Sequence, residues 1–130
     1  MGAWGMTTFE NDNASDWLYE LEESTDLSVI QEALNVDEEY IESSKGCNVL
    51  AAAEIILALL GKPRSGLPEN AKEWVGNNPL DPSPLIPSAI KAVSQVLGNE
   101  SELKELWGET DESENWENDV KDILNKLKGS

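Results

Sequence analysis

Histidine is absent from the 130-residue sequence, and cysteine occurs once, at Cys47. The lack of histidine excludes Ser-His and Cys-His catalysis and every histidine-containing zinc site. A single cysteine can form neither an internal disulfide nor a thiolate zinc site. The sequence also has no glycine-rich phosphate-binding loop. We therefore predict a protein that is not an enzyme and that uses no cofactor.

Positive charge is scarce: nine Lys and Arg residues stand against 26 Asp and Glu, which gives a formal net charge of −17. Residues 1–60 contain 13 acids and one base, Lys45. Such a field repels phosphate backbones and anionic lipid surfaces, so we expect neither a nucleic acid nor a membrane as partner. It favours a basic protein or cations. The simpler alternative is that the acidity only keeps the protein soluble.

Long apolar runs are missing too. The most apolar segment, Val49 to Leu60, is about half the length of a membrane span and contains Glu54. The first residues carry no basic segment of the kind that opens a signal peptide, so we expect a cytoplasmic protein. Hydrophobic residues still make up 39%, and five residues are Trp, which argues against disorder. The length suits one domain, residues 1–130.

An alternating strand pattern of useful length appears nowhere, whereas helical spacing recurs along the whole chain. We predict an all-α, compact single domain of about seven helices around a buried central helix at residues 44–60. An ordered N-terminal arm covers residues 1–10, and a packed, proline-rich loop covers residues 77–87. Helix starts are predicted at Asn11 or Asp12, at Pro68 as a first helical residue, and at Ser113 as a cap.

Three carboxylates are weak candidates for a metal site. Asp12 and Asp16 are spaced i, i+4 and share one helix face, and Glu54 interrupts the apolar central helix. A divalent cation could relieve the repulsion between them. The alternative is structural: Asp12 caps a helix, and Glu54 accepts hydrogen bonds from the N-terminal arm. We favour the structural alternative and assign no metal site.

A second sequence feature has some likeness to a calcium loop. Asp111, Ser113 and Asn115, with Asp122 further on, match the opening of such a loop. Its sixth position requires Gly, and the chain has Trp116 there, so we interpret the segment as a loop followed by a helix. The tryptophans are predicted to pack in the core, and Cys47 to behave as a small buried hydrophobe.

Two acidic stretches are candidate partner-binding surfaces, each with a solvated helical surface as the alternative. The first contains Glu20, Glu22, Glu23, Glu32, Asp37, Glu38, Glu39 and Glu42, of which Glu38, Glu39 and Glu42 are the preferred contacts. The second contains Glu109, Asp111, Glu112, Glu114, Glu117 and Asp119, of which Glu109, Asp111, Glu112 and Glu114 are preferred. Dense acid beside a few exposed aromatic residues can capture a basic protein by steered association.

The opening residues 1–5, Met-Gly-Ala-Trp-Gly, and the segment from Phe9 to Leu18 resemble a bacterial family called domain of unknown function 4259. The resemblance continues through residues 51–54, 60–61, 67–68, 74–75 and 78–80, and reaches residues 101–107. At positions 6–8 the chain is less rich in glycine than the family pattern. The resemblance implies a small, stand-alone bacterial protein, and it carries over no activity and no catalytic residue.

From these observations we expect a small acidic module that binds a basic protein, in its most concrete form an immunity- or inhibitor-type protein or a DNA mimic. One alternative is a carboxylate-based divalent-cation binder or metal-dependent hydrolase. Another is a structural subunit whose acidity is incidental. The sequence leaves monomer and homodimer open.

Overall fold

The computed structural model describes residues 7–36 and 39–129. The secondary-structure elements of these residues are helices, with no strand among them, which confirms the all-α prediction. The α-helices of the described part are α1 (Asp12–Glu22), α2 (Ser28–Leu34), α3 (Ser43–Leu59), α4 (Glu69–Asn77), α5 (Ile86–Val96), α6 (Glu102–Gly108) and α7 (Ser113–Lys128). A 3₁₀ turn, η1 (Ser83–Leu85), precedes α5.

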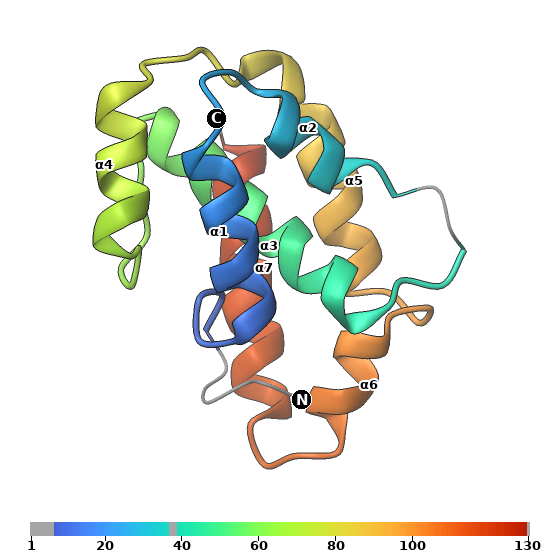
Figure 1. Ribbon diagram of the computed structural model, residues 1–130. Helices are drawn as coiled ribbons and strands as arrows, with labels where there is room; N and C mark the ends of the chain where they lie inside the picture. The colour runs from blue at the N-terminus through green and yellow to red at the C-terminus, as the bar shows by residue number, and fades with distance from the viewer. Residues whose placement is uncertain (1–6, 37–38, 130) are drawn as a thin grey trace.

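Helix α3 is the centre of the fold, as the apolar run at residues 44–60 predicts. Every residue from Val49 to Ala58 is buried, including Glu54. A helix that is apolar on all sides has to be covered on all sides. The six other α-helices of the described part all contact α3, and Figure 1 shows it crossing the middle of the molecule with α1 on one side and α7 on the other.

Local chemistry fixes the ends of the first and third helices. The side chain of Asn11 accepts a hydrogen bond from the amide of Ala14 and so caps α1. Helix α3 ends in a Schellman motif, in which the amide of Lys62 donates to the carbonyl of Leu57 at 2.9 Å. Gly61 makes the reversal with φ +80°, a conformation that favours glycine.

Three predicted boundaries need correction. Ser113 is the first residue of α7 and not its cap, because the cap position is occupied by Glu112, whose side chain makes no capping bond. Pro68 is the cap of α4 and not its first residue, so this helix begins at Glu69, one residue after the predicted start. The proline-rich loop is shorter than residues 77–87, since η1 begins at Ser83 and α5 at Ile86. Prolines fit the first turn of a helix because the missing amide has no partner there.

The described tryptophans pack in or against the core, as predicted, with Trp107 partly buried, whereas Trp4 lies outside the described residues. Trp17, Trp74 and Trp116 are buried, and the indole N–H of Trp74 donates to the carbonyl of Ser24 at 2.8 Å. Cys47 is buried in the same core. Of the predicted N-terminal arm, residues 1–6 lie outside the described residues, whereas Thr8 is buried.

Candidate functional site

A cluster of four charged residues joins the loop after α3 to α7. Arg64, the chain's single arginine, lies in this loop and donates to Glu54 on α3 at 2.9 Å. Its guanidinium also binds Asp119 and Asp122 on α7, the latter at 3.1 Å. The side chains of Arg64 and Glu54 are only 11% and 6% exposed. One planar guanidinium thus binds three carboxylates, which pins the loop between two helices.

Burial and charge act in opposite directions on this cluster. Burial disfavours the charged carboxylate and raises the pKa of Glu54, and the positive charge of Arg64 only partly opposes this. For Arg64, burial alone would lower the pKa, but Glu54 and the two aspartates outweigh it and raise the pKa. Arg64 therefore stays charged, and Glu54 keeps its proton to a higher pH than an ordinary glutamate does.

The sequence predicts that Glu54 accepts hydrogen bonds from the N-terminal arm, residues 1–10, of which the structure describes residues 7–10. The Thr8 hydroxyl lies near enough to lower the pKa of Glu54, but its oxygen makes no hydrogen bond of normal geometry. Among the described residues, the hydrogen bond of normal geometry to Glu54 comes from Arg64, which the prediction missed. Periodicity could not reveal this contact. The available signal was a lone arginine, ten residues after a carboxylate that the core had to bury.

The weak metal candidates are not brought together. Asp12 and Asp16 are exposed on α1, whereas Glu54 is buried and bound to Arg64. Across residues 7–36 and 39–129, no three His, Cys, Asp or Glu side chains are grouped so that they could hold a metal ion. The calcium-like segment is helical from Ser113 onward, so it forms no loop around a cation.

Two acidic segments that are far apart in the sequence meet at the start of α6. Ile41 and Ser101 form a parallel bridge, in which the amide of Ile41 donates to the carbonyl of Glu100 at 2.8 Å. The hydroxyl of Tyr40 donates to Glu105 at 2.7 Å. The predicted contacts Glu39 and Glu42 therefore lie beside acids that the sequence did not single out.

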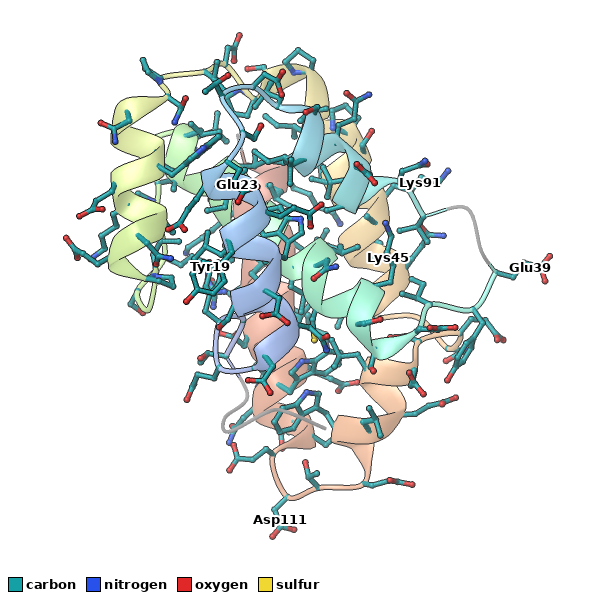
Figure 2. All side chains as sticks on the ribbon, viewed as in Figure 1. Tyr19, Glu23, Glu39, Lys45, Lys91 and Asp111 are labelled. Atoms are coloured by element: carbon teal, nitrogen blue, oxygen red, sulfur yellow. The ribbon has the colours of Figure 1, made fainter. Side chains whose placement is uncertain are left out.

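The second predicted stretch continues the same surface. Helix α6 runs from this junction to the α6–α7 turn, and Figure 2 shows Glu39 and Asp111 projecting from the molecule on either side of it. We call this surface the acidic end. It consists of eight exposed acids: Glu39, Glu42, Glu100, Glu105, Glu109, Asp111, Glu112 and Glu114. Glu38, the remaining preferred contact, lies outside the described residues.

Basic residues near the acidic end have partners elsewhere. The ammonium of Lys104 donates to the carbonyl of Leu97 at 3.0 Å and lies 3.9 Å from Glu117. The ammonium of Lys45 donates to the carbonyl of Glu32 at 3.0 Å, in the last turn of α2. A cation is well placed at the end of a helix. Neither base neutralises the acidic end through a bond to one of its carboxylates.

Tyr40 is the aromatic residue of this surface, 38% exposed. Its hydrogen bond to Glu105, together with the negative charges of Glu102 and Glu100, raises the pKa of Tyr40 to about 12. The hydroxyl therefore stays protonated at neutral pH and continues to donate. The chain's other tyrosine, Tyr19, is 63% exposed on α1 and lies away from α6 in Figure 2.

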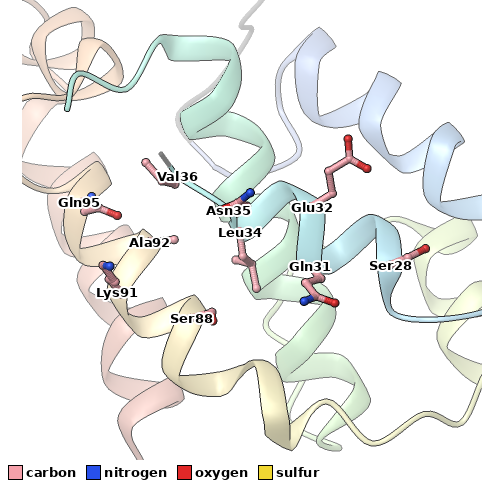
Figure 3. Close-up of a pocket in the computed structure, with 10 residues that line it drawn as sticks. All are labelled: Ser28, Gln31, Glu32, Leu34, Asn35, Val36, Ser88, Lys91, Ala92 and Gln95. Carbon is pink, nitrogen blue, oxygen red and sulfur yellow. The ribbon is translucent and has the colours of Figure 1, made fainter. Parts of the chain in front are cut away.

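A groove of about 590 Å³ runs between α2 and α5 (Figure 3). Its walls carry amides and hydroxyls such as Gln31, Ser88 and Gln95, and buried Leu34 and Ala92 lie beneath them. The charged side chains in its lining are one Glu32 and one Lys91, and no aromatic side chain is present there. The groove therefore favours neither an anionic nor a cationic ligand, and it offers no aromatic ring on which a ligand could stack.

The fold and the site define a class, a small helical domain with two polar features in its described part. The Arg64 cluster holds the loop after α3 against α7, and the acidic end is a negatively charged surface. The chain belongs to the family described as Domain of unknown function (DUF4259), whose model matches residues 2–119. No curated protein and no solved structure matches the chain. In the described part, no helix is both long and apolar enough to cross a membrane.

Proposed function

We propose that this protein is a binding module whose acidic end captures a basic protein. The observation that supports the proposal best is the pairing of residues 39–42 with residues 100–105, which joins two acid-rich segments into one surface. Folding places these like charges together although they repel one another. A basic partner would relieve that repulsion on binding.

A surface of this kind acts mainly on the rate of association. Clustered charges of one sign attract an oppositely charged partner over about a Debye length, roughly 8 Å at physiological salt. The same field excludes nucleic acids and acidic proteins, which gives selectivity. An immunity- or inhibitor-type protein, or a DNA mimic that occupies a nucleic-acid-binding protein in the cytoplasm, is the concrete form of this proposal. Such a role needs no catalytic residue.

Affinity capture with matched baits tests the proposal. Three forms of the full chain are immobilised: the wild type, an acidic-end variant and a control variant. The acidic-end variant carries Glu39→Gln, Glu100→Gln, Asp111→Asn and Glu112→Gln, so that it changes both acidic segments. The control variant carries Asp12→Asn, Asp16→Asn, Glu69→Gln and Glu73→Gln, which are exposed positions on α1 and α4 outside both acidic stretches. Each variant loses four acids, so each has a net charge of −17 + 4 = −13.

Bound proteins are eluted in salt steps and quantified by mass spectrometry. We expect a basic protein that the wild type and the control variant retain and that the acidic-end variant loses. Equal retention by all three baits would remove the acidic end from the proposal. Equal loss from both variants would indicate binding by net charge alone and would favour the incidental-acidity alternative.

A further inference from the structure

A small pocket lies at the edge of the acidic end, between the end of α2 and the start of α3. Its volume is about 210 Å³, and its lining contains Asn35, Tyr40, Glu42 and Lys45. At roughly 30 Å³ per water molecule, this space corresponds to about seven waters. That is room for one long side chain of a partner, and too little for a helix or a nucleotide.

The groups in this pocket that would bind an anion are already occupied. The ammonium of Lys45 donates to the carbonyl of Glu32. At the start of α3, where a helix attracts negative charge, the amide of Ser43 donates to the carboxylate of Glu102 at 2.7 Å. An anionic ligand would have to displace these contacts.

The groups that would bind a cation are free. In the described part of the chain, neither the carboxylate of Glu42 nor the side-chain amide of Asn35 makes a hydrogen bond or an ion pair. The Tyr40 ring is held at its hydroxyl end by Glu105, so its orientation is fixed before any partner arrives. A cation over the face of a tyrosine ring is attracted by the ring quadrupole, and neighbouring carboxylates add to this attraction.

We propose that the pocket formed by Asn35, Tyr40 and Glu42 receives an arginine side chain of the basic partner. The guanidinium would stack on the Tyr40 ring, donate to the Glu42 carboxylate and use the Asn35 amide oxygen as a further acceptor. This inference rests on the proposed function, because it assigns to the acidic end one aromatic anchor among many charges. Aromatic anchors in small pockets carry much of the energy of protein interfaces.

The test is an NMR titration of the ¹⁵N-labelled full chain at physiological salt. The probe is the peptide acetyl-Gly-Arg-Gly-amide, and acetyl-Gly-Glu-Gly-amide is the charge-reversed control. We expect saturable shifts with the arginine peptide, concentrated on the side-chain amide of Asn35 and on the backbone amides of residues 40–45. We expect none with the glutamate peptide. The reverse preference, or shifts spread evenly over the acidic surface, would overturn the proposal.

Single variants assign the contacts. Tyr40→Leu and Glu42→Gln should each weaken the arginine peptide roughly two- to fivefold. Tyr40→Phe keeps the ring and should retain most of the affinity, while Lys45→Gln should leave it unchanged or tighten it. Tyr19→Leu removes an exposed tyrosine on α1 and is the matched control, expected to bind as the wild type does.

Wild-type affinity in Tyr40→Leu, or loss of binding in Lys45→Gln, contradicts the pocket assignment, provided that the spectra show folded variants. Failure here is distinguishable from failure of the proposed function. If the acidic-end bait still loses its partner selectively while the peptide does not bind, the binding module stands and the arginine pocket does not.

Discussion

Replacement of Arg64 by Met should cost more stability than any other single change at a charged residue of the described part. Arg64→Met keeps the length of the stem and removes the guanidinium that binds Glu54, Asp119 and Asp122. Glu54 is then left buried, at 6% exposure, with no cation beside it. A buried charge without a partner is strongly destabilising.

The size of the effect follows from the exposure of each partner. Loss of one partner from a buried ion pair costs about 3–5 kcal/mol. Asp122 is 47% exposed, so its share is that of a surface pair, about 0–1 kcal/mol. We therefore expect a loss near the lower limit, about 3 kcal/mol. With about 2.1 cal/mol/K of unfolding entropy per residue, this corresponds to a Tm that is lower by about 11 °C.

Chemical denaturation and thermal melts measure this loss, and the double variant Glu54→Gln/Arg64→Met provides the control. The double variant removes the unpaired charge and should recover about half of the stability that Arg64→Met loses. Lowering the pH also removes the charge of Glu54, by protonation. Because the pKa of Glu54 is raised by folding, its contribution is fully present below the ordinary value of 4.5 and is lost as the pH rises through the folded-state pKa.

Without Arg64, more stability is lost as the pH rises, because the positive charge that opposed the rise in the pKa of Glu54 is gone. The single variant should therefore gain more stability than the double variant when the pH falls from 7 to about 5. An Arg64→Met protein within about 0.5 kcal/mol of the wild type would refute this reasoning. Identical pH dependence in the single and double variants would refute it as well.

Three further predictions concern local chemistry. Asn11→Ala removes the cap of α1 and should lower the free energy of unfolding by about 1 kcal/mol in urea denaturation, whereas Asn11→Asp should preserve it. Gly61→Ala should lower the free energy of unfolding by about 1–2 kcal/mol, because its φ is +80° and an alanine there is strained. No neighbouring atom would contact the new methyl group, so backbone strain is the whole cost, and a neutral result would contradict the assigned turn. Glu105→Gln should lower the pKa of Tyr40 from about 12, because it removes the carboxylate that accepts the hydroxyl's hydrogen bond. In an absorbance titration, the phenolate of Tyr40 should then form at lower pH than in the wild type, and its signal is identified by its loss in Tyr40→Phe.

Much of the fold was predictable because its signals are local. The spacing of Ala14, Trp17, Leu18 and Leu21 identifies α1, and the apolar run around Val49 identifies α3 as the buried centre. Gly61 marks the end of α3 through its own conformational preference. Such signals depend on neighbours within a few turns, so one sequence is enough to interpret them.

The candidate site was predictable only in part, because it is assembled by contacts between distant residues. The acids at residues 39–42 and 109–114 were visible as charge, but their connection through α6 depends on the pairing of Ile41 with Ser101. Arg64 and Asp122 are 58 residues apart, and no periodicity relates them. The misassigned cap at Ser113 has a similar cause, since a cap depends on one or two backbone angles that composition does not specify.

The association rate of the captured basic partner tests the central claim most directly. Stopped-flow or surface-based kinetics at several salt concentrations would compare the wild type with the acidic-end and control variants. Steered binding by the acidic end predicts a rate that falls steeply with salt in the wild type and the control variant, and a slow, weakly salt-dependent rate in the acidic-end variant. The same salt dependence in both variants would contradict the claim, because net charge, and not this surface, would then govern association.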